Sequence, residues 1–375
     1  GRYSVGGLPL VAHAVRQALA AETVHRVVVS TDDAEIAAVA RRHGAEVVER
    51  PLDLAGDAAS SESALLHALD ALQAADDYRP DLLVFLQCTA PLTTAEDIDG
   101  TVRALLDQDA DSALSAAPAH LFLWRAGPDG AAEAVNHDAR VRPRRQDREP
   151  EFLETGAVYA MRVPGFRSAG HRFFGRTALY VQPPERALEV DEPLDLVHAE
   201  VAIRERARTE RVQQLPLRPA ALVLDFDGVM TDGAVTLDQD GKESVRCHRR
   251  DGMGIERLRA AGIPVLVLSK ERNPVVTARC AKLNVPCLQG IDRKLPALTA
   301  WLDEHGIDPA AAIFLGDDVN DAECLEAVGC GVVVADAHPD VRPRARIQLD
   351  TPGGQGAVRE LTDLIEQRLR ENSDA

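Results

Sequence analysis

The chain has 375 residues, of which 45% are hydrophobic and 27% charged, and its formal net charge is -18. This composition is typical of a folded globular protein, and the length favours two domains of about 100 to 200 residues each. The acidic charge excludes nonspecific nucleic-acid binders, which need basic surface to displace counterions. Any phosphate group bound by this protein therefore requires cations beside it.

The sequence indicates neither membrane insertion nor secretion. It contains no apolar run of about 18 to 20 residues, and its N-terminus lacks the basic-then-apolar pattern of a signal peptide. The six cysteines form no CxxC pair and have no histidine at zinc-finger spacing, so we expect reduced core thiols. We expect a cytoplasmic protein that binds neither nucleic acid nor membranes.

The first half alternates helical and strand-like segments. We expect helices at 11–21, 33–43, 61–74 and 195–206, and strands at 26–30, 46–48, 81–87, 156–161 and 178–181. The run DLLVFLQ at 81–87 is typical of a central strand buried on both faces. The alternation predicts an α/β domain with a mostly parallel sheet. We interpret the polar segment 119–150, rich in Arg, Pro and Gly, as an active-site loop region.

A second α/β series follows the charged stretch 208–219, which lacks periodicity and contains the expected domain boundary, between residues 211 and 212. We expect strands at 221–224, 263–268, 311–315 and 331–334, with helices at 254–261, 275–283, 295–305 and 321–328. The sequence thus predicts the α/β class, with two Rossmann-like three-layer domains at 1–211 and 212–375.

Four polar signals follow the strands of the second series in order. They are Asp225-Phe226-Asp227-Gly228-Val229, Ser269-Lys270, Lys294, and Gly316-Asp317-Asp318-Val319-Asn320-Asp321. Asp-x-Asp alone is a weak signal and more often marks a turn, where acidic side chains accept local hydrogen bonds. Because ligands bind at the carboxyl ends of strands in open α/β sheets, the ordered set of four predicts one crevice.

The residue types in this crevice fit attack on a phosphate ester by a carboxylate. Repulsion between the two anions must be cancelled, which Mg²⁺ on hard oxygen ligands can do. Asp225, with Asp317 or Asp318, is the expected ligand set, and Asp227 is a further candidate.

Each remaining side chain then has an expected role. Asp225 is the nucleophile that forms a covalent intermediate, and Asp227 protonates the leaving alkoxide and later activates water. Ser269 and Lys294 stabilise the phosphoryl oxygens by a hydrogen bond and a charge.

Further motifs extend this pattern from residue 222 to residue 360. They are DFDGVMTDG at 225–233, DGMGI at 251–255, Gln289-Gly290 ahead of the lysine, and GGQGAVRE at 353–360. Together they resemble the haloacid dehalogenase (HAD) superfamily, in its branch of KDO 8-phosphate phosphatases. The resemblance implies a minimal cap and a homotetramer whose subunits close each other's sites, with the hairpin 235–245 used for packing. The segment around Lys270 is similar to sialic-acid synthesis fusions, and this lysine is either functional or simply solvated.

The first half has an acidic cluster of its own at Glu189, Asp191, Glu192 and Asp195. The cluster is either a divalent metal site or the acidic start of a helix, which the helix dipole favours. The cluster is the last of a series of motifs along the first half. They are VVVSTDD at 27–33, Arg50-Pro51, LQCTAPL at 86–92, Arg144-Arg145-Gln146, GAVY at 156–159 and Glu189-Val190-Asp191.

In this order the motifs resemble the N-acylneuraminate cytidylyltransferases. That family joins CTP to a nine-carbon keto-acid sugar and releases pyrophosphate with the support of Mg²⁺. The resemblance implies that Glu189 and Asp191 hold the metal and that Arg50 meets the nucleotide. The residues expected in the sugar pocket are Gln87, Tyr159, Phe173 and Phe174. Arg144 and Arg145 either bind phosphate or the sugar carboxylate, or are ordinary loop arginines.

Three departures from the family pattern matter. The family has aspartate in place of Glu189 and asparagine in place of Thr155. It also begins with a strand and a Gly-rich, lysine-bearing loop around the triphosphate. The residues given start after these elements and include no lysine before Lys242, so we expect the first strand and the nucleotide loop to be absent.

The sequence as a whole predicts a bifunctional enzyme that acts on CTP, a nonulosonic acid and a sugar phosphate. A phosphatase that frees the keto-acid sugar would supply the synthetase. Two alternatives stay open: either only the C-terminal phosphatase is active, or the phosphatase-like domain serves only for oligomerisation.

Overall fold

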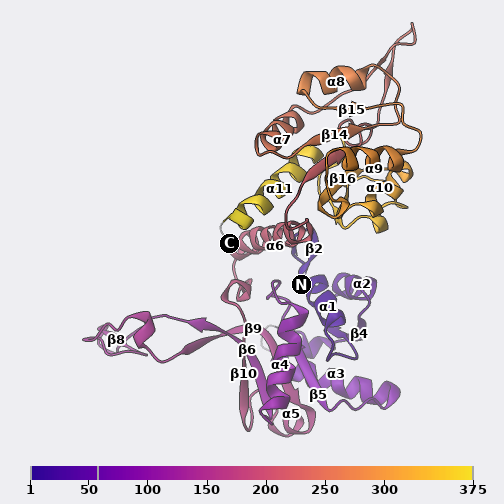
Figure 1. Cartoon of the computed structure of the whole chain (residues 1–375). Coiled ribbons are helices and arrows are strands. Elements are labelled where there is room, and N and C mark those ends of the chain that lie inside the picture. The colour runs from indigo at the N-terminus through magenta and orange to yellow at the C-terminus, as the bar shows by residue number, and fades with distance from the viewer. Residues whose placement is uncertain (1, 57–58, 374–375) are drawn as a thin grey trace. The chain divides into compact units, whose positions relative to one another are not determined.

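The computed structural model describes residues 2–56 and 59–373 and separates two compact units, Gly1–Arg204 and Glu205–Ala375. The division falls inside helix α6 (Pro193–Gln214), which Figure 1 labels. The predicted boundary, between residues 211 and 212, lies in the last turn of the same helix and stays a prediction. Within the described part of the chain, no helix has the length and apolarity that crossing a bilayer requires.

Helix α6 is longer than expected, because residues 207–214 are helical as well. This stretch lacks an apolar period, yet Arg, Glu and Gln are good helix formers. Exposed side chains along the helix also pair one turn apart, Arg204 with Glu200 at 2.7 Å and Arg206 with Glu210 at 3.7 Å. The helix predicted at 195–206 therefore extends further, through Gln214.

The N-terminal unit is built on a four-stranded sheet of order β10-β6-β9-β5. Its strands are β5 (Leu82–Leu86), β6 (Ser112–Ala119), β9 (Glu151–Arg162) and β10 (Thr177–Val181). Strand β9 runs antiparallel to both β5 and β6, so this sheet is mixed and not mostly parallel as expected. Separate pairs are formed by β3 (Val28–Thr31) with β4 (Glu46–Glu49), and by β1 (Ser4–Val5) with β2 (Leu8–Pro9).

The helices of this unit follow the predicted order, with α4 and the short α5 in addition. They are α1 (Leu10–Ala20), α2 (Ala34–Arg42), α3 (Ser61–Asp76), α4 (Ala95–Asp107) and α5 (Val163–Ala169). Helix α4, which was not predicted, begins with a capping box between Thr94 and Asp97.

Strand β5 has an open edge. Among the described residues, β5 pairs with β9 only and β3 with β4 only. Consecutive residues of both strands line one cavity of about 980 Å³. All five residues of β5 are half-buried, so the expectation of a strand buried on both faces was wrong. The apolar pattern of β5 is that of a central strand, but one of its edges borders the cavity and has no paired strand among the described residues.

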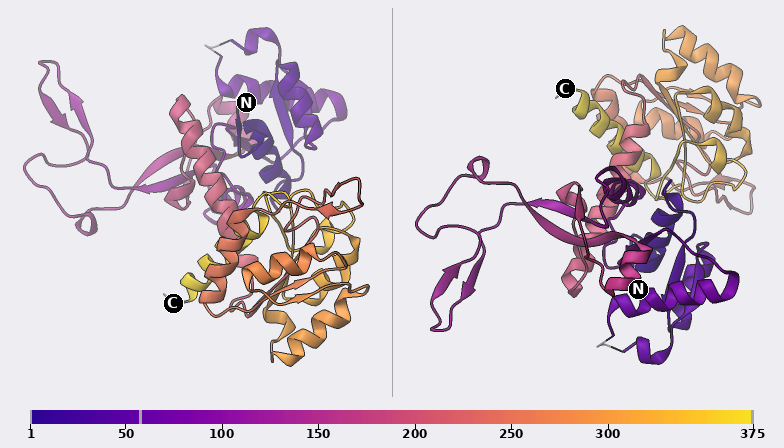
Figure 2. Two further views of the ribbon diagram at one scale, coloured as in Figure 1. Left: turned by 90° about the horizontal axis from the view of Figure 1, so that it is seen from above. Right: turned by 90° about the horizontal axis from the view of Figure 1, so that it is seen from below.

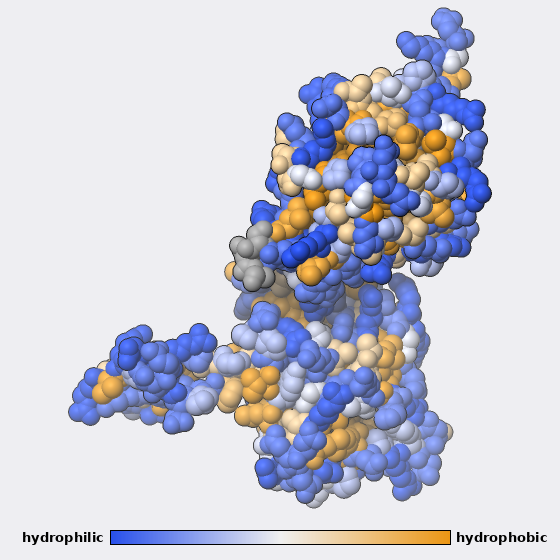
Figure 3. All heavy atoms as spheres, in the orientation of Figure 1, coloured by the Kyte–Doolittle hydropathy of each residue, from blue (hydrophilic) through white to orange (hydrophobic). Residues whose placement is uncertain are grey.

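Residues 120–150 form an arm. Its hairpin, β7 (Trp124–Ala126) with β8 (Ala132–Ala134), extends away from the sheet of its own unit in Figures 1 and 2. Figure 3 shows the arm as mostly hydrophilic, and its aromatic residues pack locally, with Phe122 and Trp124 both against His137. The segment interpreted as an active-site loop region therefore does not line the cavity of about 980 Å³.

The C-terminal unit contains a six-stranded parallel sheet of order β15-β14-β11-β16-β17-β18. The strands are β11 (Ala221–Leu224), β14 (Val265–Leu268), β15 (Cys287–Leu288), β16 (Ala312–Gly316), β17 (Cys330–Val333) and β18 (Ile347–Gln348). Every residue of the four central strands is buried, as their apolar runs predicted. A small hairpin of β12 (Thr236–Leu237) and β13 (Glu243–Ser244) turns where expected.

Helices cover both faces of this sheet, which confirms the predicted three layers. They are α7 (Arg249–Ala260), α8 (Val275–Leu283), α9 (Lys294–Glu304), α10 (Ala322–Ala327) and α11 (Ala357–Ser373). Helix α7 packs on α8 and α11, and α9 packs on α10. Figure 1 shows these two groups on opposite sides of the strands.

A buried carboxyl group joins α7 to α11. Asp251, in the first turn of α7, is fully buried, and its Oδ1 accepts the backbone N–H of Arg359 at 2.9 Å. Its Oδ2 has no hydrogen-bond partner among the described residues. Burial raises the pKa of Asp251 to about 6.

We therefore expect Asp251→Asn to stabilise the C-terminal unit in a pH-dependent way. In the unfolded chain the carboxyl group titrates near about 3.9. The stability contributed by protonated Asp251 is thus complete below about pH 4 and is lost as the pH rises through 6. The asparagine variant stays neutral, so its free energy of unfolding should exceed that of the parent by on the order of 2–3 kcal/mol near pH 8.

Urea unfolding followed by Trp301 fluorescence measures this difference, since Trp301 is 7% exposed in the core of the unit. The measurement uses a Trp124→Phe background, because Trp124 is the second tryptophan of the chain. A difference that stayed constant between pH 4 and pH 8 would contradict the role of Asp251 ionisation.

Candidate active site

The site in the C-terminal unit lies where the strand order reverses. Strand β11 is the first of its sheet in sequence and lies between β14 and β16. Asp225 follows β11, Ser269 follows β14, and Asp317 follows β16. Three adjacent parallel strands therefore bring these side chains to one edge of the sheet, as the sequence predicted.

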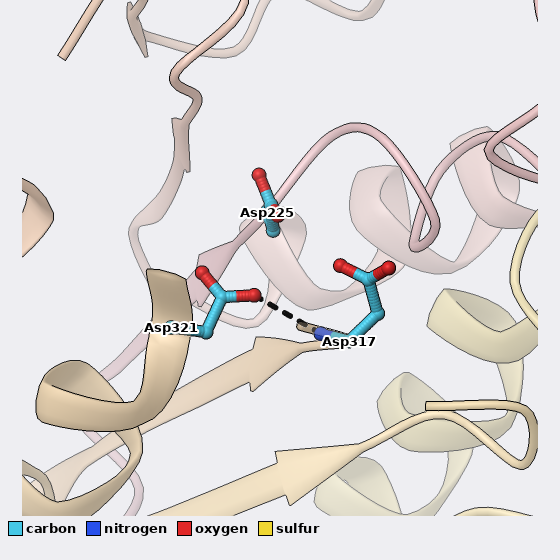
Figure 4. Close-up of side chains that lie close together, drawn as sticks. All are labelled: Asp225, Asp317 and Asp321. Carbon is cyan, nitrogen blue, oxygen red and sulfur yellow. Dashed lines mark hydrogen bonds between the residues drawn. The ribbon is translucent and has the colours of Figure 1, made fainter. Parts of the chain in front are cut away.

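Three carboxylates meet at this edge. One oxygen from each of Asp225, Asp317 and Asp321 lies within 4.8 Å of the others. Figure 4 shows Asp225 at the end of its strand, facing the two residues from the loop after β16. Such close acidic side chains repel one another unless cations or protons lie between them.

Lys294 supplies one of these cations. Its Nζ lies 2.8 Å from Asp225 Oδ1 and 2.6 Å from Asp321 Oδ1, and the residue is only 3% exposed. Burial lowers the pKa of Lys294, but the carboxylates of Asp225 and Asp321 outweigh burial and leave the pKa raised. The ammonium group is therefore charged and fixed in place.

One ammonium does not neutralise three carboxylates. Burial, together with the charge of Asp321, raises the pKa of Asp225 well above its usual value. Burial and the charges of Asp321 and Asp318 raise the pKa of Asp317 to about 7. In addition, Asp317 Oδ1 is buried without a hydrogen-bond partner among the described residues. These features fit a site for a divalent cation held by hard oxygen ligands.

Asp321 and Asp318 have other partners. Asp321 Oδ2 accepts the backbone N–H of Asp317 at 3.0 Å, so this residue holds both Lys294 and the Asp317 backbone. Asp321 belongs to a predicted motif but had no predicted role of its own. Asp318 is exposed, and its carboxylate accepts the N–H of Val319 at 2.7 Å. The structure thus brings Asp317 to Asp225 and directs Asp318 to a local turn.

The loop after β11, residues 226–232, is called the catalytic loop below. Gly228 has φ of +75°, and a Cβ there would overlap the carboxylate of Asp317, so only glycine fits. The buried Thr231 hydroxyl accepts the N–H groups of Gly228 and Gly233 at 3.3 Å and 3.2 Å, which closes the turn.

Burial, and then the charge of Glu271, raise the pKa of the half-buried Asp227. A carboxyl group with a raised pKa is suited to donate a proton.

Ser269 is buried at the end of β14. Its Oγ accepts the N–H of Glu271 at 3.0 Å, which leaves the hydroxyl proton free to be donated elsewhere. Lys270 is exposed beside it.

In the N-terminal unit, Arg50 and Gln87 both line the 980 Å³ cavity. The Arg50 guanidinium donates to the carbonyl and the hydroxyl of Ser30, at the end of β3. Glu189 lies near Thr89, another lining residue, with 3.4 Å between the carboxylate and the hydroxyl. Burial, and then the charge of Asp191, raise the pKa of Glu189. The structure thus brings Arg50 and Gln87 to one cavity, and Glu189 next to its lining residue Thr89, with the charge of Asp191 acting on Glu189.

The aromatic residues form a second group. The rings of Tyr159 and Phe85 stack at 5.8 Å, and Phe173 meets Tyr159 edge-on at 5.9 Å. Phe174 packs against Gly165 in the same apolar cluster. The Tyr159 hydroxyl donates to Glu154, and burial raises the pKa of Tyr159. The sequence did not single out Arg172, which lies over the rings of Phe85 and Tyr159.

Arg144 and Arg145 are not brought to this cavity. Both are exposed on the arm, and Arg144 pairs with Asp147 three residues on, at 3.1 Å. The contacts of Arg144 and Arg145 among the described residues are those of ordinary loop arginines.

Known proteins resemble the two halves separately and the chain as a whole. A family model described as cytidylyltransferase matches residues 3–163, and one described as haloacid dehalogenase-like hydrolase matches residues 289–361. N-acylneuraminate cytidylyltransferase A of Danio rerio is 28% identical over 370 residues, which cover 96% of this chain and 83% of that protein.

The C-terminal half has bacterial relatives. The 3-deoxy-D-manno-octulosonate 8-phosphate phosphatase KdsC of Salmonella typhi is 39% identical over 145 residues, which cover 38% of this chain and 77% of that protein. The phosphatase of the same name from Moraxella catarrhalis, solved in complex with magnesium ion, phosphate ion and a KDO molecule, is 26% identical. That match covers 44% of this chain and 95% of the solved one, with a TM-score of 0.42.

Each half therefore has its own enzyme family. The chain is a fusion of a cytidylyltransferase domain with a C-terminal domain that belongs to the haloacid dehalogenase-like hydrolases, in the family of the 3-deoxy-D-manno-octulosonate 8-phosphate phosphatases.

Proposed function

We propose that the C-terminal domain hydrolyses a sugar phosphate through an aspartyl-phosphate on Asp225, with Mg²⁺ as cofactor. The observation that carries this proposal is the buried excess of carboxylates around Lys294 at the ends of β11 and β16. Similarity to phosphatases of an eight-carbon keto-acid sugar phosphate supports a keto-acid sugar phosphate as the substrate class.

Asp225 and Asp317 would hold the cation through side-chain oxygens, while Asp227 and Asp318 remain the further candidates from the sequence. When bound, Mg²⁺ cancels the repulsion between the substrate phosphate and the carboxylates. Lys294 is held beside Asp225 and can pair with a phosphoryl oxygen, and Ser269 can donate its hydroxyl proton to another.

The reaction takes two steps. The Asp225 carboxylate attacks phosphorus, the P–O bond to the sugar breaks, and protonated Asp227 gives its proton to the leaving oxygen. Water then attacks the acyl phosphate, its proton passes to Asp227, and the Asp225 carboxylate leaves. The raised pKa of Asp227 supports its role as the acid of the first step.

We also propose that this domain assembles as a cytoplasmic tetramer in which the hairpin of β12 and β13 packs against a neighbouring subunit. Val235 and Leu237 support this role, since they are 53% and 62% exposed at the hairpin. Exposed apolar side chains at one place are typical of an interface.

For the N-terminal domain we propose transfer of CMP from CTP to a nonulosonic acid, with release of pyrophosphate. Similarity to an N-acylneuraminate cytidylyltransferase along nearly the whole chain supports this activity, as does the gathering of Arg50, Gln87 and Glu189. Release of pyrophosphate distinguishes this activity from the alternative in which only the phosphatase is active.

Asp225→Asn should abolish hydrolysis, because an amide cannot act as the nucleophile. We expect kcat for a phosphate monoester to fall by about 1000-fold or more. Steady-state hydrolysis of p-nitrophenyl phosphate measures the loss, with Asp303→Asn on the exposed face of α9 as the control. Hydrolysis by the Asp225 variant at the parent rate would refute the mechanism through Asp225. A parent protein that hydrolyses no ester would leave the oligomerisation alternative.

Binding of Mg²⁺ should stabilise the folded C-terminal domain even without substrate. At a Mg²⁺ concentration of about 100 times Kd, the gain is about 2.7 kcal/mol and should appear as a higher unfolding temperature in Trp301 fluorescence. Asp317→Asn should lose this gain, and the adjacent Asp318→Asn should keep it, because only Asp317 faces Asp225. The reverse result would make Asp318 the ligand.

The two activities should separate by mutation. Incubated with CTP, a nonulosonic acid and Mg²⁺, the chain should release pyrophosphate, and Glu189→Gln should reduce this release by about 100-fold while leaving phosphate-ester hydrolysis unchanged. Asp225→Asn should do the opposite. Hydrolysis without any pyrophosphate release in the parent would establish the phosphatase-only alternative.

A further inference from the structure

A loop from the end of the chain packs directly on the catalytic loop. This glycine loop, residues 352–356, meets it backbone to backbone. The N–H of Gly354 donates to the carbonyl of Val229 at 3.0 Å. A Cβ on Gly353 would overlap the carbonyl oxygen of Gly228, and one on Gly354 would overlap the backbone of Thr231 and Asp232. With no side chain between the loops, any shift of one displaces the other.

Such a displacement reaches the reacting groups. Gly228 lies against the carboxylate of Asp317, and Asp227 precedes it in the chain. The glycine loop therefore fixes the position of Asp227, the proposed acid, and the space beside Asp317, the proposed metal ligand. Misplacement of a catalytic group by about 1 Å can lower a rate by about 100-fold.

Glu360 holds the segment that leads into the glycine loop. It lies in the first turn of α11, and its two carboxylate oxygens accept backbone N–H groups from the segment before the loop. Oε1 accepts from Asp350 at 3.1 Å and Oε2 from Thr351 at 2.9 Å. One side chain thus joins the two ends of the loop.

Arg211 holds Glu360 in turn. It lies in the last turn of α6, and its Nη1 donates to Glu360 Oε1 at 3.1 Å. Both terminal nitrogens also donate to the carboxylate of Asp350, at 2.6 Å and 2.8 Å. The hydrogen bonds that Arg211 donates to Asp350 raise the pKa of Arg211, so the guanidinium keeps its charge. Bidentate pairing of this kind fixes orientation as well as distance.

We propose that Arg211 is a positioning residue of the phosphatase site, acting through Glu360 and the glycine loop on the catalytic loop. The inference rests on the proposed hydrolase function of this domain. Its structural consequence is that the end of α6, a helix that begins in the N-terminal unit, is a working part of the phosphatase.

The test measures p-nitrophenyl phosphate hydrolysis with Mg²⁺ by the full chain. Arg211→Ala should lower kcat per folded molecule by about 10- to 100-fold, with the folded fraction taken from Trp301 unfolding curves. Millimolar guanidinium chloride should restore part of the rate by occupying the vacated position. Arg211→Lys should recover only part of it, since an ammonium cannot make the bidentate pair.

Two comparisons isolate the pathway. Glu360→Gln should also lower kcat, and the double variant should be no slower than the slower single variant, because both residues act through one loop. Arg344→Ala is the matched control. It breaks a 2.6 Å ion pair with Glu326 in the same domain and should leave kcat unchanged.

The possible outcomes separate the two proposals. A parent protein that does not hydrolyse the ester would refute the proposed function. A parent that hydrolyses it, with Arg211→Ala within twofold of the parent rate, or with additive losses in the double variant, would overturn the positioning role alone. If the alanine variant does not fold, Arg211→Lys and Glu360→Gln decide by the same criteria.

Discussion

The buried ammonium of Lys294 between Asp225 and Asp321 is the interaction on which the phosphatase domain depends. Burying a charge costs several kcal/mol unless it is paired. Here the ammonium pairs with two carboxylates, and a third, that of Asp317, lies beside them. Burial and the remaining negative charge raise the pKa of Asp317 to about 7. One oxygen of Asp317 is also buried without a hydrogen-bond partner among the described residues. A divalent cation would neutralise the excess negative charge and provide a partner for the Asp317 oxygen. The repulsion among the carboxylates is therefore itself a reason to expect a cation here.

Holding these groups together requires a rigid support, which the parallel sheet supplies. Strands β11, β14 and β16 are buried along their whole length, so the positions of their ends are fixed by packing on both faces. The loops after them approach more closely than side chains allow, which is why Gly228, Gly353 and Gly354 stand at the contacts. The same closeness makes the catalytic loop sensitive to residues as distant in sequence as Glu360 and Arg211.

The sequence predicted most of this domain because its signals are local. Strands of four or five apolar residues, each followed by a polar motif, were recognisable one by one, and topology brought them together. Tertiary contacts were beyond such reasoning. Asp317 and Asp318 are adjacent and identical in type, so only the fold distinguishes the carboxylate that faces Asp225 from the one that caps a turn. Asp321 was missed because its role is to hold Lys294, a residue 27 positions earlier. The end of α6 was missed because its helix is stabilised by charge pairs and not by an apolar stripe.

The N-terminal half shows the limit of pattern reasoning in another way. The run 81–87 was correctly identified as apolar on both faces, yet β5 is half-buried because one of its edges faces a cavity. A pattern of this kind is satisfied only when strands pair on both edges, so the described residues leave the requirement of β5 unmet. No central strand of the phosphatase sheet has this mismatch, since each has a parallel neighbour on both sides. Asp225, Ser269 and Asp317 of the phosphatase domain follow strands that are paired on both edges. Arg50 and Gln87 instead border a cavity onto which one edge of β5 opens.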